Sequence, residues 1–227
     1  SRSQHKSQGF GSSPSLKSNI EYLELISGQK IYSNNIFEDI DTSWERVNGG
    51  KEIETLIIDV LENFDFKKPY NSLNKLLKIY KKIQKVEDNH IKDIKIKELS
   101  EIIINCLGLE IQFNSKRSYG IPESYVDVEF KFYNPSPINI DINKIEVNDL
   151  NINNILFQNK KVYSLKRKIK IPNNYTAPFW LLGNKTLGNY FVEDFKIKVN
   201  PETLHPIKSI FNIKVKDVII KIEKVLN

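Results

Sequence analysis

The sequence has no methionine and only one cysteine, Cys106, among its 227 residues. A single cysteine excludes an internal disulfide, so packing alone must hold the fold together. No apolar run approaches the ~18 residues that a membrane-spanning helix needs. No basic start leads into an apolar stretch, so no signal peptide is visible. Because methionine is missing even at position 1, we expect the chain to be an internal or processed fragment of a larger protein.

Motifs of known catalytic sites are also missing. None of the three histidines, His5, His90 and His205, stands at a metal-binding spacing such as H-x-x-x-H. A zinc site needs three or four converging ligands, so we predict no metal and no other cofactor in this chain. There is no glycine-rich phosphate loop and no G-x-S-x-G elbow, and the serines around His5 lack an orienting acid. The chain is therefore predicted to hold no catalytic residue.

The acidic residues offer one cluster, made of Glu38, Asp39 and Asp41. Neighbouring carboxylates act as acid and base only where their surroundings separate their pKa values. A structural role is favoured, in which Asp41 or Thr42 caps a short helix and Trp44 anchors that helix in a core.

The chain is basic, with 34 Lys and Arg residues against 28 Asp and Glu residues and a net charge of +6. Such a balance raises the possibility of a nucleic-acid partner. The lysines, however, are scattered, and they alternate with apolar residues or fall on polar helix faces. A nucleic-acid binder gathers its basic residues on one face, often beside stacking aromatic rings. We therefore predict no nucleic-acid partner.

Hydrophobic spacing divides the chain into three parts. Residues 1–30 are expected to be a tail, because residues 1–18 are too polar to form a core, or, as the resemblance described below implies, the end of a missing catalytic domain. A helical region follows at 31–109. The remainder, 110–227, is predicted to be a β-sandwich domain.

The helical region contains stretches with apolar residues at helical spacing. They cover residues 53–64, 73–83 and about 94–107. Asn71 or Ser72 is placed to cap the second helix, and Gly108 is placed to end the third in a left-handed conformation. Cys106 falls on an apolar helix face, which favours a buried core residue over a catalytic thiol.

After Gly108 the hydrophobic period changes to two, which is typical of half-buried antiparallel strands. Apolar and polar residues alternate over 126–132, 138–142, 195–199, 211–215 and 218–222. The phase resets at Lys216-Asp217, which predicts a hairpin with a two-residue loop. Six or more short strands predict an immunoglobulin-like antiparallel β-sandwich, and the whole chain an α+β protein.

Tyr175, Phe179 and Trp180 surround Pro178 and are the best candidates for ligand-facing aromatic residues. Aromatic rings offer flat apolar faces that suit sugar rings. The competing interpretation, which we favour, is that Trp180 fills the core of the sandwich or packs on the helices.

Four segments carry a family resemblance in their order along the chain. They are SRSQHKSQGFG at 1–11, EYLEL at 21–25, IDTSWERVNGG at 40–50 and TAPFWLL at 176–182. Together they resemble the stretch that follows the catalytic domain in large PIG-L/LmbE-type deacetylases of the Bacteroidetes kind. The match covers most of the chain. It departs at Phe179, where tyrosine is expected in relatives, and the family's His-Pro-Asp-Asp metal motif is absent.

The resemblance implies a parent enzyme that hydrolyses the acetamide of an N-acetylglucosamine-like sugar, with zinc and an Asp base in an upstream catalytic domain. This chain would be a non-catalytic part of that enzyme. Its partner would be the upstream catalytic domain, which it would support. The resemblance places Arg2, His5 and Gln8 closest to the substrate. His5 would either orient the substrate or the residues around the catalytic zinc, or it would only cap or pack on the missing domain. Because relatives of this layout are usually exported, we expect a periplasmic location.

A second hypothesis is a stand-alone β-sandwich module that binds a glycan or a protein partner. It predicts a solvent-facing aromatic patch around Tyr175, Phe179 or Tyr190. A third hypothesis, a self-contained enzyme, has little support beyond scattered acids and the three histidines.

Overall fold

The computed structural model describes residues 18, 20–28, 30, 32–33, 35–38, 40–199 and 203–227. The chain forms two compact units, Ser1–Thr42 and Ser43–Asn227. The described residues of the first unit are all exposed and form turns, bends and irregular chain. One turn of this unit is closed by the Glu38 carboxylate, which accepts hydrogen bonds from the backbone N–H groups of Tyr32 and Ser33 at 2.9 and 2.8 Å.

The second unit begins with the predicted helical block. Its helices are η2 (Trp44–Arg46), α2 (Gly50–Glu62), η3 (Pro69–Ser72), α3 (Leu73–Ile83) and α4 (Asn89–Leu107). The apolar stripes of the three α-helices confirm the helical spacing, since residues such as Ile53, Leu76 and Ile103 are buried.

The ends of these helices differ in part from the prediction. The short helix η2 is capped by Ser43, whose hydroxyl accepts from the N–H of Glu45, so the prediction of Asp41 or Thr42 as its cap is wrong. Helix α4 starts earlier than expected, because the Asp88 carboxylate accepts from the N–H of Ile91 and caps it. Gly108 has φ +64° and ends α4 in the left-handed conformation, as predicted.

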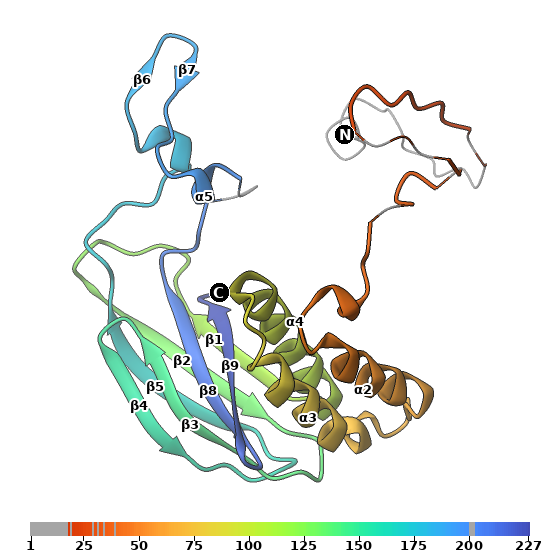
Figure 1. Ribbon diagram of the computed structural model, residues 1–227. Coiled ribbons are helices and arrows are strands. Elements are labelled where there is room, and N and C mark those ends of the chain that lie inside the picture. Colours follow the sequence, from red (N-terminus) through yellow and green to blue (C-terminus); the bar gives the residue numbers. More distant parts are fainter. Residues whose placement is uncertain are drawn as a thin grey trace. The chain divides into compact units, whose positions relative to one another are not determined.

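The strands form two main antiparallel sheets, which confirms an α+β protein. One sheet has the order β1-β2-β5 and the other the order β4-β3-β8-β9. Their strands are β1 (Glu110–Ser115), β2 (Tyr125–Tyr133), β3 (Ile140–Val147), β4 (Leu150–Ile155), β5 (Tyr163–Lys170), β8 (Lys208–Val215) and β9 (Val218–Val225). A small hairpin, β6 (Lys185–Thr186) and β7 (Asn189–Tyr190), lies between β5 and β8 in the sequence and is visible at the top of Figure 1.

The two main sheets face each other through aromatic side chains. Phe130 and Phe132 point inward from β2, and both are almost fully buried. Their ring centroids lie 6.1 and 5.9 Å from that of Phe211 on β8, in edge-on geometry. The alternation predicted for β2 is therefore confirmed, and its apolar face forms the contact between the sheets.

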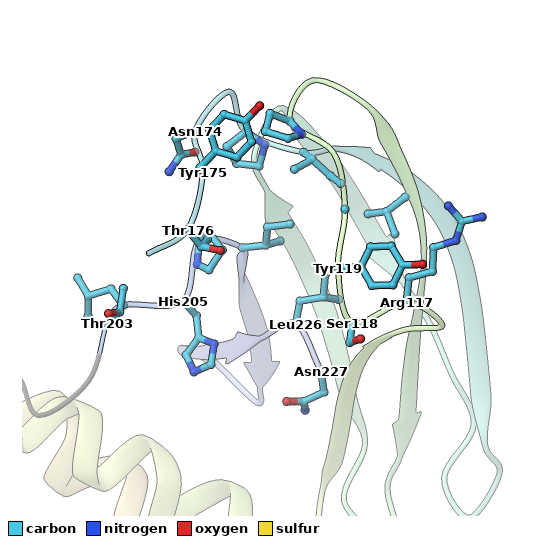
Figure 2. Close-up of a pocket in the computed structure, with 18 residues that line it drawn as sticks. Arg117, Ser118, Tyr119, Asn174, Tyr175, Thr176, Thr203, His205, Leu226 and Asn227 are labelled. Atoms are coloured by element: carbon cyan, nitrogen blue, oxygen red, sulfur yellow. The ribbon is translucent and has the colours of Figure 1, made fainter. Parts of the chain in front are cut away.

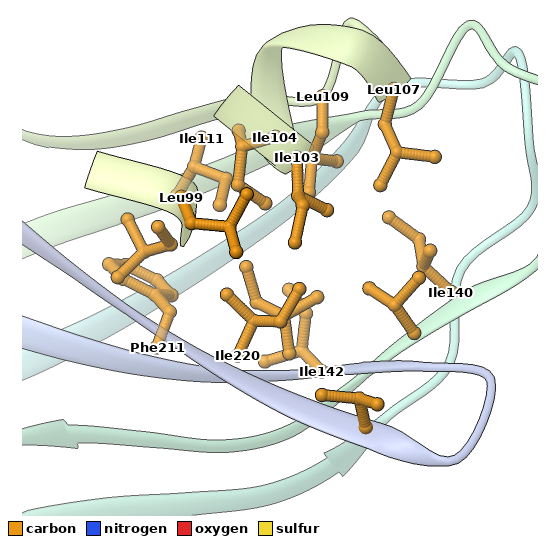
Figure 3. Close-up of a cluster of buried hydrophobic side chains, with 14 of the residues drawn as sticks. Leu99, Ile103, Ile104, Leu107, Leu109, Ile111, Ile140, Ile142, Phe211 and Ile220 are labelled. Atoms are coloured by element: carbon orange, nitrogen blue, oxygen red, sulfur yellow. The ribbon is translucent and has the colours of Figure 1, made fainter. Parts of the chain in front are cut away.

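The helices and the sheets share one hydrophobic core. Figure 3 shows Leu99, Ile103 and Leu107 of α4 beside Ile142 of β3 and Ile220 of β9. At the change from helix to strand, Leu109 is buried in this core, whereas its neighbours Gly108 and Glu110 are exposed.

The longest departure from the prediction lies between β5 and β8. Residues 195–199 were expected to form a strand, and this is wrong, since α5 (Phe195–Lys198) is a short helix. This part of the chain carries no buried residue from 172 to 199 among those with a described side chain. A helical turn satisfies the backbone locally instead, with the N–H of Lys198 donating to the carbonyl of Asp194 at 3.1 Å.

The predicted hairpin at Lys216-Asp217 is confirmed, with Val215 paired to Val218. Lys216 has φ +56°, a conformation that Lys adopts at a cost and Gly adopts freely. Two contacts with α3 hold this turn: Lys216 Nζ donates to Asn74, and Lys81 Nζ forms an ion pair with the Asp217 carboxylate. The helical block thereby compensates for a turn sequence that is weak on its own.

The Lys81–Asp217 ion pair makes a testable contribution to stability. Its hydrogen bond, together with the turn backbone, holds the pKa of Asp217 below the ordinary value. A carboxyl whose pKa is depressed on folding stabilises the fold above its unfolded pKa, and that contribution disappears as the pH falls through the folded pKa. We expect Asp217→Asn to lower the melting temperature slightly at pH 7 and low salt. The difference should vanish as the pH falls through the depressed pKa of Asp217, and also in ~1 M NaCl.

Differential scanning calorimetry across pH and salt checks this expectation. Asp127→Asn is the matched control, because Asp127 is exposed on the outer face of β2 and forms no ion pair with any of the described residues. A loss at Asp217 that persists unchanged in high salt would mean that the side chain acts through the turn backbone and not through Lys81.

Candidate functional site

A cavity of about 520 Å³ opens at one end of the two sheets. Its walls come from loops at 117–122, 171–176 and 203–207, and from the last residues, Leu226 and Asn227. Figure 2 shows Arg117, Ser118 and Tyr119 on one side and Tyr175 and Thr176 on the other, with His205 lower in the opening. The volume lies in the range of small-molecule sites, about 300–1,000 Å³.

Backbone hydrogen bonds fix the walls of this cavity. The N–H of Ile171 donates to Ser124 at 2.9 Å, and the N–H of Leu226 donates to Ile207 at 3.1 Å. Asn227 exchanges backbone hydrogen bonds with β1, accepting from Ser115 at 2.7 Å and donating to Phe113 at 3.1 Å. Loops tied to strand ends in this way hold their side chains on a rigid support.

The cavity combines an apolar floor with a polar rim. Val126 and Ile207 belong to the buried core, and Ile171 and Leu226 pack against it. The rim carries two highly exposed tyrosines, Tyr119 at 80% and Tyr175 at 82%. The hydrogen-bonding side chains of the lining are Ser118, Asn174, Thr176, Thr203 and Asn227, together with the basic residues Arg117 and His205.

Among the predicted aromatic residues, Tyr175 lines the cavity, whereas Phe179 and Trp180 lie on the neighbouring turn η4 (Phe179–Leu181). Their rings meet edge to face with centroids 5.0 Å apart. The N–H of Phe179 donates to the hydroxyl of Thr203, a lining residue, at 3.2 Å. Trp180 is 39% exposed, so the interpretation that it fills the core is wrong.

The other candidates from the sequence take different places. Arg2, His5, Gln8 and Asp39 lie outside the described residues. Glu38 closes its turn, and the backbone N–H groups of Ser33 and Tyr32 hold the pKa of its carboxyl below the ordinary value. Within the described ranges, no group of three or more His, Cys, Asp or Glu side chains is arranged to bind a metal ion.

A second hollow of about 480 Å³ lies on the helical block and is almost entirely apolar. We call it the helical groove; α2, α3 and α4 form most of it, and Trp44 of η2 adds to its lining. Its exposed apolar side chains include Leu61 at 70% and Phe66 at 87%. Cys106 also lines the groove, and burial raises the pKa of its thiol, which fits the predicted role as an inert core residue.

The cavity residues Arg117, Tyr119 and His205 were not predicted from the sequence to lie together. Residues 116–124, KRSYGIPES, have the composition of an ordinary turn, and His205 stands alone between Leu204 and Pro206. Only the pairing of strands brings these loops together at one end of the sheets, and no local pattern in the sequence predicts that meeting.

No protein family and no curated protein matches the chain. Among solved structures, the Pseudomonas fluorescens alkylpurine DNA glycosylase AlkC, bound to DNA containing an abasic site analog, aligns with 8% sequence identity. The alignment covers 70% of this chain and 46% of the glycosylase chain, with a TM-score of 0.25. A likeness that weak establishes neither a shared fold nor a shared activity. Within the described ranges, every helix is too short or too polar to cross a lipid bilayer.

Proposed function

We propose that this chain is the non-catalytic helical and β-sheet part of a PIG-L/LmbE-type zinc-dependent N-acetylglucosaminyl deacetylase, and that it supports the catalytic domain. The observation that carries the proposal is the helical groove. Soluble proteins rarely leave a contiguous apolar surface of this kind open to water unless a partner covers it. Trp44, a residue of the IDTSWERVNGG segment on which the resemblance rests, lines this groove.

The charge pattern of the groove suits a protein partner. Its two charged lining residues, Lys95 and Glu98, form an ion pair with each other at 2.8 Å. The remaining lining is apolar, with aromatic side chains at Trp44, Phe64 and Phe66. Depletion of charge and enrichment of aromatic residues are typical of the centre of a protein–protein interface. The partner would be the catalytic domain, which would hold the zinc, in a periplasmic protein.

The arrangement of the two main sheets is also part of the proposal. We propose that the two main sheets are an immunoglobulin-like sandwich. In constant-type immunoglobulin domains, strands A, B, E and D form one sheet and C, F and G the other. The sheets β1-β2-β5 and β4-β3-β8-β9 fit this order if the fourth strand has moved to the second sheet.

The proposal predicts that this chain alone binds no stoichiometric zinc and releases no acetate from N-acetylglucosamine oligomers. The same chain, extended upstream to include a His-Pro-Asp-Asp motif, should show both, because zinc and its ligands supply the reactive hydroxide. Metal analysis and an acetate assay on the two proteins test this. One equivalent of zinc or acetate release in the short chain would contradict the proposal.

A pair of variants of the longer protein tests the groove. Phe66→Asp places a charge in the groove and should expose the partner surface, seen as faster proteolysis between the domains and lower activity. Phe195→Asp is the matched control, since Phe195 is 74% exposed and lies outside the groove. If both variants behave like the parent protein, the groove is not the contact with the catalytic domain.

The cavity at the end of the sheets favours a second function, a module that binds a glycan. Tyr119 and Tyr175 stand at its mouth with highly exposed rings, and amide and hydroxyl side chains accompany them. Apolar ring faces beside a few hydrogen-bonding groups are the composition expected of a small-ligand site. The two functions are compatible, since the groove and the cavity share no lining residue.

A further inference from the structure

We propose that the cavity at the end of the sheets binds a saccharide that carries an anionic group, such as a carboxylate. This inference rests on the glycan-binding function proposed above and adds the charge class of the ligand. It depends on the charges around the cavity, on the guanidinium of Arg117 and on the two tyrosines at the mouth.

The described residues that line the cavity include no acidic side chain. None of these 18 residues is Asp or Glu, although 28 of the chain's 227 residues are acidic. Arg117 and His205 are among the lining residues. The hollow on the outer face of the three-stranded sheet differs, because Asp127 and Glu129 stand there among Lys166 and Lys168. A cavity lined by basic and not by acidic side chains attracts negatively charged ligands.

Arg117 is chemically suited to hold an anion. No ion pair joins it to a carboxylate in the part of the chain that the structure describes, whereas several lysines form ion pairs with Asp or Glu there. Its guanidinium remains charged at all ordinary pH values and presents paired N–H donors that match a carboxylate or phosphate. A ligand oxyanion would therefore not have to displace a carboxylate of the described residues.

The tyrosines point to a ring-shaped ligand and not to a simple anion. Figure 2 shows Tyr119 near Arg117 on one wall and Tyr175 on the opposite wall. Rings held on opposite sides of an opening present apolar faces to a sugar. Asn174, Thr176 and Asn227 line the same opening, and their side chains can donate and accept hydrogen bonds to sugar hydroxyl groups.

Isothermal titration calorimetry with two tetrasaccharides tests the inference. A hyaluronan tetrasaccharide contains glucuronate and N-acetylglucosamine units, and chitotetraose contains N-acetylglucosamine alone. We expect the hyaluronan tetrasaccharide to bind about tenfold more tightly at low salt, because a charge-assisted hydrogen bond exceeds a neutral one by roughly that factor. The difference should shrink as salt is added.

Three variants separate the contributions. Arg117→Gln should remove the preference for the charged tetrasaccharide, because it should weaken hyaluronan binding by about tenfold more than chitotetraose binding. Arg167→Gln is the matched control, because it changes net charge equally and lies outside the cavity, and it should keep the preference. Tyr175→Ala should lower the affinity for both tetrasaccharides. Circular dichroism confirms that each variant is folded.

The outcomes distinguish the two levels of the proposal. Equal affinity for the two tetrasaccharides, or an unchanged preference in Arg117→Gln, would overturn the anionic ligand while the glycan-binding function stands. No binding of either tetrasaccharide would overturn both, and the supporting role of the helical groove would remain to be judged by its own test.

Discussion

Replacing Phe211 with alanine is expected to lower the free energy of unfolding by about 3–5 kcal/mol, the cost typical of truncating a buried phenylalanine. Phe211 is fully buried on β8. Its ring meets Phe130 and Phe132 from the opposite sheet at 6.1 and 5.9 Å. Removal of the ring leaves a cavity between the sheets, where no disulfide limits their separation. Because domains are stable by only about 5–15 kcal/mol, this loss would remove much of the stability.

Urea unfolding followed by circular dichroism measures the loss. Phe195→Ala is the matched control, since Phe195 is 74% exposed and should change stability by less than about 0.5 kcal/mol. Equal and small losses at the two positions would mean that the sheets do not pack through the aromatic cluster.

Replacing Gly50 with alanine is expected to cost about 3 kcal/mol, at the upper end of what overpacking usually costs. A Cβ at this position would lie 1.8 Å from the carbonyl oxygen of Trp44 and 2.7 Å from its carbonyl carbon. Those atoms are backbone, so η2 would have to move away from α2. Because Trp44 lines the helical groove, the same change should alter its fluorescence.

The neighbouring glycine supplies the comparison. Gly49 has φ +75°, and nothing lies within 4 Å of a Cβ built there. Gly49→Ala should therefore cost only the strain of a left-handed alanine, about 1 kcal/mol. Thermal unfolding of both variants tests whether Gly50→Ala is the more destabilising of the two. If Gly49→Ala were the more damaging change, the close approach of η2 to α2 would be in doubt.

Residues with a strong local pattern were predicted well. The alternation from Val126 to Phe132, the end of α4 at Gly108 and the hairpin at Lys216-Asp217 are all present. Each follows from a local rule: strand period, left-handed glycine or turn length. In β5 the rule fails, because an edge strand with the sequence YSLKRKIK exposes most of its side chains and shows little alternation of apolar residues.

Two further failures have identifiable physical causes. In β3 a register shift between Ile142 and Lys144 changes which side chains point inward, so that Ile145 and Val147 are buried. A single-residue bulge of this kind leaves no signal in the alternation. The cavity depends on loops that are distant in sequence, and only Tyr175 among its residues was selected from the sequence.

The contacts of the β8–β9 turn constrain the order in which the chain can fold during synthesis. Asn74 and Lys81 belong to a helix made early, yet their partners lie 142 and 136 residues later. Strand β1 likewise forms its backbone hydrogen bonds with Asn227 only after the last residue has been synthesised. A ribosome releasing the chain from its N-terminal end would therefore expose the helices long before the strands that cover them emerge. Such long-range closure slows folding and leaves the nascent chain open to aggregation, so this protein should depend on chaperones more than its length suggests.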